Sequence, residues 1–186
     1  MTQQTTLYTD TLVHQRATEE REVDYSVPIE DDFGALNRDR IPVRSMKESD
    51  LGALIAIDRR VGGRDRTPYY ERKVAEVFEE SGVRVSLVAE IDDHPVGFIM
   101  ARVDFGEFGR AAPEAVMDTV GVDPDYAHRG VGLALMSQLM ANLGTLRVDR
   151  VRTQLDWNDA TLIAFLDRCG FKPSQRIAFV REIDAA

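Results

Sequence analysis

The stretch Val120–Leu135, VGVDPDYAHRGVGLAL, is the most informative part of this 186-residue sequence. An apolar segment typical of a β-strand ends at Asp123-Pro124, and Gly130-Val131-Gly132 then opens an apolar segment that predicts a helix towards Leu143. The first N–H groups of a helix have no partner within it, and the helix dipole favours negative charge there. Because glycines also let a ligand approach the backbone, the stretch predicts a site for a phosphate-bearing ligand.

Two common phosphate-binding motifs do not match these glycines. A P-loop requires Lys and then Ser or Thr directly after its last glycine, and no Lys follows Gly132. A dinucleotide-binding turn requires a third small residue three places later, where this chain has Leu135. His128 and Arg129 precede the glycines and would add polar or cationic contacts to an anion. The alternative without a ligand is an ordinary strand-to-helix turn whose glycines allow tight packing.

The segment Ala127–Gly132 resembles the acyl-CoA-binding motif of the GNAT (Gcn5-related) N-acetyltransferases, usually written Q/R-x-x-G-x-G/A. Ala127 stands where the family has Gln or Arg, but binding there is mostly through backbone N–H groups. A second likeness lies downstream, where a helix over Thr161–Cys169 is followed by Gly170-Phe171, similar to the "GF" that begins the family's last hairpin. The two motifs occur in the family's order and spacing, so the resemblance covers roughly Ile41–Glu182.

The remaining segments predict the order β-α-α-β-β-β-α-β-α-β, which is the GNAT order, so the expected fold is α/β with a mixed sheet and helices on both sides. Residues 1–40, polar and acid-rich, predict an extension, disordered or packed on a partner subunit in a homodimer, before a GNAT domain at 41–186. The predicted strands are Ile41–Met46, Val83–Ile91, Val96–Phe105, Ala115–Val122, Val151–Leu155 and Gln175–Glu182. The predicted helices run from a capping box at Ser45–Glu48 to Arg60, over Tyr69–Glu80, from Gly130 towards Leu143, and over Thr161–Cys169 after the capping pair Asn158-Asp159.

The resemblance implies that acetyl-CoA is a cosubstrate. In the family, the fourth strand carries a bulge whose free backbone N–H groups hold the pantetheine arm and polarise the acyl carbonyl. By position, those N–H groups would come from Val120 to Val122. The full set of implied cofactor-binding residues is Val120, Gly121, Val122, His128, Arg129, Gly130, Val131, Gly132, Asn158 and Arg168.

The expected reaction requires a base, because an alkyl amine with a pKa near ~10.4 arrives protonated and cannot attack a thioester. Asp118 is the candidate, since strand alternation would place it on the same face as Val120 and Val122. The alternative is a solvated or salt-bridged carboxylate. Glu107 is a second, weaker catalytic candidate, in a turn on the acceptor side that the resemblance implies. The other candidates to line that acceptor cleft are Arg64, Asp65, Arg66 and Tyr70, and the alternative for each is a surface or ion-pair role.

One departure from the family bears on this chemistry. Many members carry a Tyr four residues before the Gly of "GF", where it protonates the departing CoA thiolate, and this chain has Leu166 there. The sequence therefore leaves two functions open. The first is an enzyme that moves an acetyl group from acetyl-CoA to a primary amine of a small molecule or a protein lysine. The second is a catalytically weak GNAT domain that binds acyl-CoA as a sensor or interaction module.

Composition limits the other possibilities. A net charge of −9 argues against nucleic-acid binding; it would suit a cationic acceptor, although solubility alone explains it more simply. One cysteine, Cys169, cannot form an internal disulfide and is expected to pack, as is Trp157. The three histidines lack metal-ligand spacing, so no metal site is predicted. Without a membrane-length apolar run or a signal-peptide pattern, we expect a cytoplasmic protein that does not bind membranes.

Overall fold

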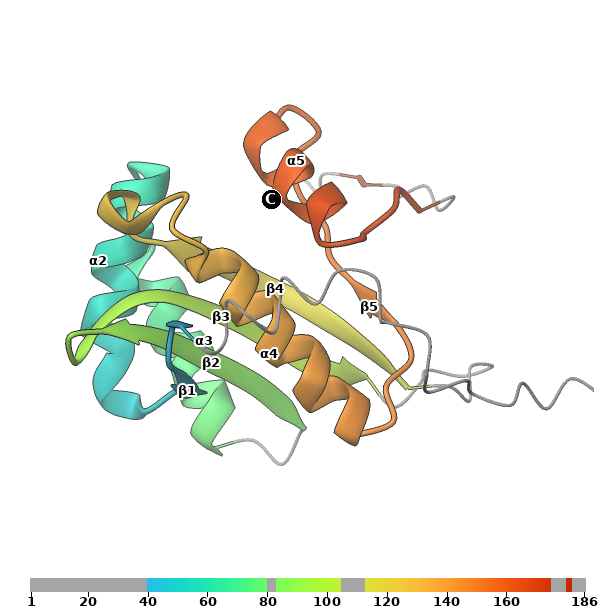
Figure 1. Cartoon of the computed structure of the whole chain (residues 1–186), viewed down its shortest axis with the longest axis horizontal. Helices are drawn as coiled ribbons and strands as arrows, with labels where there is room; N and C mark the ends of the chain where they lie inside the picture. Colours follow the sequence, from blue (N-terminus) through green and yellow to red (C-terminus); the bar gives the residue numbers. More distant parts are fainter. Residues whose placement is uncertain (1–39, 80–82, 105–112, 175–179, 182–186) are drawn as a thin grey trace, which may run out of the picture. The chain divides into compact units, whose positions relative to one another are not determined.

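The computed structural model describes residues 40–79, 83–104, 113–174 and 180–181, all within one compact unit, Phe33–Ala186. Five strands form a sheet in the order β1-β2-β3-β4-β5 (Figure 1). Neighbouring strands are antiparallel except β4 and β5, which are parallel, so the predicted mixed sheet is confirmed. The strands are β1 (Val43–Ser45), β2 (Arg84–Ile91), β3 (His94–Asp104), β4 (Glu114–Val122) and β5 (Val151–Arg152). The predicted last strand, Gln175–Glu182, falls mostly outside the described residues.

Helices cover both faces of the sheet, as predicted (Figure 1). Helix α4 (Val131–Thr145) packs on one face through buried residues such as Leu135 and Leu139. Helices α2 (Leu51–Gly62) and α3 (Thr67–Glu79) lie on the other face, where Leu54, Tyr70 and Phe98 form a second core. Helix α5 (Ala160–Arg168) follows β5, and two short 3₁₀ turns, η1 (Glu48–Asp50) and η2 (Pro124–Tyr126), precede α2 and α4.

The predicted capping box at Ser45–Glu48 is wrong. Ser45 ends β1, where it lies opposite Leu87 of β2, so it is held in the sheet rather than at a helix start. Asp50 performs the capping instead, because its Oδ2 accepts a hydrogen bond from the Lys47 backbone N–H at 2.7 Å. The Arg44 guanidinium donates to both oxygens of the same carboxylate, at 2.7 and 2.8 Å.

Replacing Asp50 by Asn is expected to lower the free energy of unfolding by about 2 kcal/mol at neutral pH, because the buried Arg44 bond loses its charge. The Arg44 hydrogen bonds hold the pKa of Asp50 below its ordinary value, and the Lys47 N–H adds to this effect. A lowered folded-state pKa means that this stabilisation is complete above about pH 4 and is lost as the pH falls through the folded pKa.

Urea unfolding between pH 7 and pH 3 measures this effect. The difference between wild type and Asp50→Asn should stay constant down to about pH 5 and shrink below about pH 4. Asp167→Asn is the matched control, since Asp167 pairs with Lys172 at the surface with both side chains mostly exposed, and should change little. An Asp50→Asn difference that does not depend on pH would contradict the argument.

Candidate functional site

The start of α4 offers unpaired backbone N–H groups. Gly130 is the N-cap residue, in the left-handed conformation with φ of 89°, and among the described residues no side chain caps the helix. The first helical bond runs from the Ala134 N–H to the Gly130 carbonyl at 2.9 Å. The N–H groups of Val131–Leu133 therefore have no partner within the helix. The prediction that the glycine pair opens a helix is confirmed.

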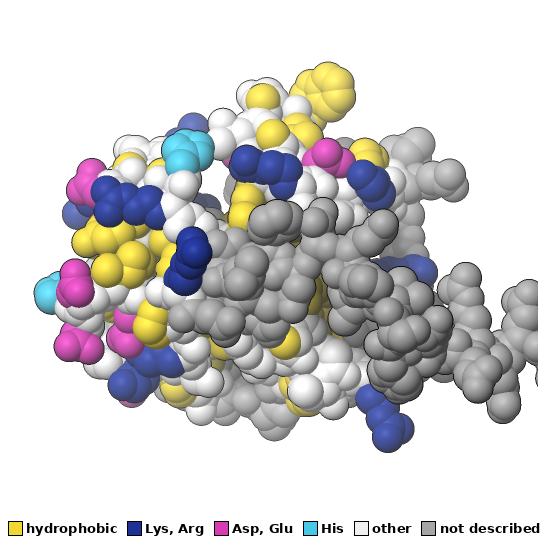
Figure 2. All heavy atoms as spheres, viewed as in Figure 1, with side chains coloured by type: hydrophobic (Ala, Val, Ile, Leu, Met, Phe, Trp, Pro, Cys, Tyr) yellow, Lys and Arg dark blue, Asp and Glu magenta, His cyan; other side chains and the backbone are white. Residues whose placement is uncertain are grey.

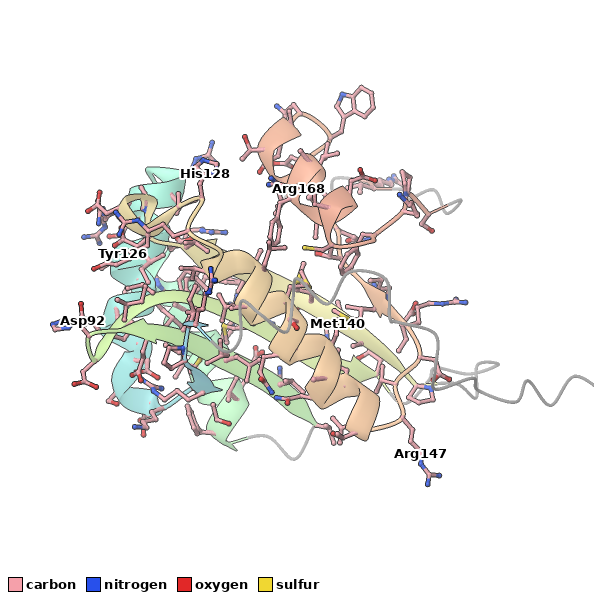
Figure 3. All side chains as sticks on the ribbon, viewed as in Figure 1. Asp92, Tyr126, His128, Met140, Arg147 and Arg168 are labelled. Atoms are coloured by element: carbon pink, nitrogen blue, oxygen red, sulfur yellow. The ribbon has the colours of Figure 1, made fainter. Side chains whose placement is uncertain are left out.

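The turn before α4 is tied to α2. The Arg60 guanidinium donates to both oxygens of Asp123 at 2.7 Å and to Asp125 at 2.9 Å. The single charge of Arg60 thus offsets part of the negative charge of these two carboxylates, beside a helix start that favours anions. His128, at φ of 60°, and Arg129 are both exposed on this turn, which Figure 3 shows at the upper end of α4.

Strand β4 carries a bulge at Asp118. Met100 of β3 lies opposite Thr119, whereas the next residue, Ala101, lies opposite Met117, so Asp118 is the extra residue. The bulge therefore lies two residues before Val120, and Val120–Val122 pair regularly with β3. A bulge is set by the register between two strands.

The bulge decides which backbone groups leave the sheet. The Asp123 N–H donates to the Val96 carbonyl of β3 at 2.9 Å, and backbone groups alternate in direction along a strand. Val120 and Val122 therefore point their N–H groups away from β3. Before the bulge, the odd-numbered residues point their N–H groups away from β3, because the Ala115 N–H donates to the Arg150 carbonyl on the β5 side.

On the side of β4 away from β3, β5 pairs with β4 over only two residues. Ala115 pairs with Val151 and Val116 with Arg152, and the Thr153 hydroxyl then donates to the Met117 carbonyl at 2.9 Å. Strand β5 is thus shorter than the predicted Val151–Leu155. Among the described residues, none continues the pairing along Val120–Val122, so these backbone groups lie on an open strand edge.

Asp118 does not share a face with Val120 and Val122, and that prediction is wrong. The two valines pack against the core beneath α4, whereas Asp118 faces α3 and binds Lys73 Nζ at 3.5 Å. The Arg102 guanidinium binds the other carboxylate oxygen. The extra bulge residue shifts the alternation by one, which moves Asp118 to the opposite face. These contacts match the salt-bridged alternative, and its role as base remains a prediction.

The Asp118 pairs belong to a chain of alternating charges across this face of the sheet. Each member lies within 4.0 Å of an oppositely charged neighbour, and most are at least half-buried. In order, the chain runs through Arg84, Glu76, Lys73, Asp118, Arg102, Asp104, Arg152 and Glu114.

The predicted acceptor-side residues separate into four cases. Glu107 lies outside the described residues. Arg64 and Asp65 are exposed in the α2–α3 connection, where the Thr67 hydroxyl and amide hold the pKa of Asp65 below its ordinary value. Tyr70 has no exposed surface, so the prediction that it lines a cleft is wrong. Arg66 is half-exposed, but its guanidinium is bound to the buried Asp58.

Gly132 is consistent with both explanations of the glycine pair, tight packing of the turn and close approach of a ligand. A Cβ atom at Gly132 would lie 3.0 Å from the Phe165 ring of α5, so the glycine lets α5 pack on the first turn of α4. Asn158 does not cap α5; Asp159 does, accepting the Leu162 N–H at 3.0 Å. Asn158 is exposed one residue earlier, beside the start of this helix.

The rest of α5 carries no acid in the position of the family's Tyr. Leu166 there is buried, with 5% of its surface exposed. Burial raises the pKa of the Cys169 thiol to about 11, so the thiol stays protonated at neutral pH, and its packing role is confirmed. Trp157, predicted to pack, is 93% exposed, so that prediction is wrong. Arg168 is exposed in the last turn of α5 and lies in the upper part of Figure 3, as does His128.

Charge is not segregated on the visible surface. Figure 2 shows acidic and basic side chains interspersed over the described part of one face, which offers no concentrated field for a cationic acceptor. Within 40–79, 83–104, 113–174 and 180–181, no cluster of three or more His, Cys, Asp or Glu is placed to hold a metal ion. No helix in those ranges is both long and apolar enough to span a bilayer.

Sequence reasoning missed Asp58 and Thr119, which Tyr70 connects. Tyr70 Oη lies 2.9 Å from Asp58 Oδ1 and 3.4 Å from Thr119 Oγ1. The twelve-residue separation of Asp58 and Tyr70 spans two helices and a glycine-containing turn, so no helical spacing links them. A charged residue among the apolar positions of α2 was the available signal for Asp58.

The sequence matches the model of the Acetyltransferase (GNAT) family over residues 53–171. That span is more than half of the chain, and the fold and the open start of α4 agree with it, so the protein belongs to the GNAT acetyltransferase family. No curated protein matches the sequence significantly.

Solved structures resemble the chain at low identity, and the likeness shows the fold. A transcriptional regulator from Bacillus halodurans C-125 is 17% identical with a TM-score of 0.65, over 76% of this chain and 99% of that one. AAC(6')-Iy, in complex with the bisubstrate analog CoA-S-monomethyl-acetylneamine, is 16% identical with a TM-score of 0.65, over 77% and 99%. The aminoglycoside 6'-N-acetyltransferase AAC(6')-Ih from Acinetobacter baumannii is 14% identical with a TM-score of 0.65, over 78% and 99%.

Proposed function

We propose that residues 41–186 transfer an acetyl group from acetyl-CoA to a primary amine, carried by a small molecule or a protein lysine. The observation that carries the proposal is the uncapped start of α4, where three backbone N–H groups lie beside the turn that leaves β4. The aminoglycoside acetyltransferases among the structural neighbours support a small-molecule acceptor.

The residues at this end of the sheet fit acetyl-CoA. The N–H groups of Val131–Leu133 suit the pyrophosphate, and Arg60 offsets part of the charge of the nearby acidic side chains. His128, Arg129 and Arg168 are exposed and would supply polar or cationic contacts to phosphate groups. Asn158 would complete the binding set from the start of α5.

The backbone of Val120, Gly121 and Val122 would hold the reactive end. An N–H group aimed at the acyl carbonyl stabilises the negative charge that develops on its oxygen when the amine attacks. The amine must first lose a proton, and we assign this step to Asp118, acting directly or through water. The C–S bond then breaks, and water protonates the departing thiolate, because the buried, apolar Leu166 has no proton to give.

Replacing Asp118 by Asn is expected to lower kcat about 100-fold or more and to alter the pH profile of turnover, because an amide cannot take up the proton of the amine. Acetyl-CoA affinity should stay within about twofold, since the start of α4 is unchanged. Steady-state kinetics with CoA thiol detection between pH 6 and pH 9 measures both effects.

Asp104→Asn is the matched control. Asp104 belongs to the same chain of charges, pairs with Arg102 and Arg152, and lies off β4. It should keep kcat and the pH profile close to wild type. If Asp118→Asn behaves like Asp104→Asn, Asp118 is an ion-pair residue and the base is another group.

The alternative, a GNAT domain that binds acyl-CoA without turnover, is favoured by one observation, the buried Leu166 in place of the family's Tyr. Calorimetry with acetyl-CoA and a turnover assay over polyamines, amino acids, aminoglycosides, aryl amines and lysine-bearing proteins separate the two. Binding with acetyl transfer supports the enzyme, and binding without transfer to any acceptor supports the sensor. An absence of binding overturns both.

A further inference from the structure

A hydrogen-bonded chain runs from the β4 bulge into the helical layer. The Tyr70 hydroxyl lies 2.9 Å from Asp58 Oδ1 and 3.4 Å from Thr119 Oγ1. Because an ionised carboxylate only accepts hydrogen bonds, Tyr70 donates to Asp58. The Thr119 hydroxyl must then be the donor to Tyr70. Each hydroxyl of the chain is thus fixed in one direction.

The burial of this chain requires a reason. Tyr70 has no exposed surface and Asp58 is 5% exposed, and such groups are costly to bury unless they are hydrogen-bonded. The Arg66 guanidinium binds both carboxylate oxygens and compensates the charge of Asp58. Burial raises the pKa of the Tyr70 phenol, so it remains a donor at all physiological pH values. Thr119, partly exposed on β4, is the end of the chain that reaches the sheet.

Thr119 directly follows the bulge residue. The hydrogen-bonded chain therefore reaches β4 where the alternation of its backbone N–H directions reverses. The bulge puts Asp118 and Thr119 on the same face, towards α3. Helix α3 holds both of them, Asp118 through Lys73 and Thr119 through Tyr70. If the bulge were lost, the register beyond it would shift by one residue and the backbone groups there would reverse direction.

We propose that Tyr70 and Asp58 are positioning residues for acyl transfer. Through Thr119 they fix the β4 bulge, and the bulge directs the N–H groups of Val120 and Val122 away from β3. This inference rests on the proposed function, because those N–H groups matter only if an acyl carbonyl lies against them. The start of α4 does not depend on the bulge, so losing the chain should slow the chemical step far more than it weakens acetyl-CoA binding.

The test compares variants that remove one hydroxyl at a time from the full-length protein. Thr119→Val and Tyr70→Phe should each lower kcat about tenfold or more, with acetyl-CoA affinity by calorimetry within about twofold, because a small misplacement of a catalytic group is costly. Thr119→Ser retains the hydroxyl and should restore most of the rate. The double variant should be no slower than either single variant, since both break the same chain.

Two controls identify a positioning role. Tyr69→Phe removes the hydroxyl of a neighbouring ring that packs edge-on against Tyr70, with ring centroids 5.1 Å apart, and it should leave kcat unchanged. The pH profile of Thr119→Val should keep its wild-type shape, which would not hold if Thr119 relayed the proton. Three outcomes would overturn the inference. The first is a wild-type kcat in Thr119→Val, and the second is an equal loss of acetyl-CoA affinity and rate. The third is a double variant in which the effects of the two substitutions multiply.

Amide hydrogen exchange provides a readout that does not need turnover. The N–H groups of Thr119 and Gly121 point towards β3, so their exchange reports on the pairing beside the bulge. They should exchange at least about tenfold faster in Tyr70→Phe than in Tyr69→Phe. If the exchange rates of these N–H groups do not change in Tyr70→Phe, Tyr70 does not stabilise the bulge and the inference is overturned. If exchange accelerates but wild-type protein acetylates no amine, it is the proposed function that fails, and the catalytic part of this inference fails with it.

Discussion

Replacing Gly130 by Val should weaken acetyl-CoA binding about 100-fold, or ~2.7 kcal/mol. Gly130 adopts φ of 89° at the N-cap of α4, a conformation that costs a β-branched residue about 1–3 kcal/mol. The variant must either keep this strain or turn the backbone, and a turned backbone no longer aims the N–H groups of Val131–Leu133 at one point. A Val side chain would also occupy space that a phosphate needs. Titration calorimetry with acetyl-CoA measures the loss.

Gly144→Ala is the matched control for this prediction. Gly144 lies near the opposite end of α4, and a Cβ atom there would have no neighbour within 4 Å. Alanine favours the helical conformation, so stability should be unchanged or slightly higher and affinity should stay at the wild-type value. If Gly130→Val binds acetyl-CoA as tightly as Gly144→Ala, the start of α4 is not the phosphate site.

The elements that the sequence predicted well are those with local causes. Gly170 follows the end of α5 in the left-handed conformation, and Gly130 begins α4 in the same one. The turn between β2 and β3 places Asp92 and Asp93 at positive φ, a tight hairpin that their sequence favours. Each of these signals lies within a few residues of the structure that it determines, so a single sequence contains it.

The position of the bulge could not be predicted, because it depends on the register between β3 and β4. The polar contacts of the candidate site could not be predicted for the same reason. Asp118 binds Lys73 and Arg102, which are 45 and 16 residues away, and Tyr70 meets Thr119 at a separation of 49. Strand alternation gave the wrong face for Asp118 because one extra residue reverses it. The local glycine pattern predicted the start of α4, whereas the network behind β4 is visible only in the folded chain.

The same region makes Phe98 the residue whose truncation should destabilise the protein most. Phe98 is 1% exposed on β3, and its ring packs edge-on against Tyr70 with centroids 5.7 Å apart. Two of its ring atoms lie only 2.7 and 2.9 Å from where Gly121 would carry a Cβ atom. The ring therefore fills the space that this glycine leaves between β4 and the layer of α2 and α3.

Phe98→Ala should lower the free energy of unfolding by about 3–5 kcal/mol, because the flanking strand and helices cannot close the cavity completely. For a domain of this size, that loss corresponds to a fall in Tm of roughly 10 °C. Phe78→Ala is the control, since Phe78 lies on α3 with 48% of its surface exposed and should cost less than about 1 kcal/mol. Urea and thermal unfolding compare the two, and equal losses would show that the Phe98 ring does not support β4. Since Phe98 supports the same strand that Tyr70 holds at its bulge, Phe98→Ala should also lower kcat at temperatures where the variant remains folded.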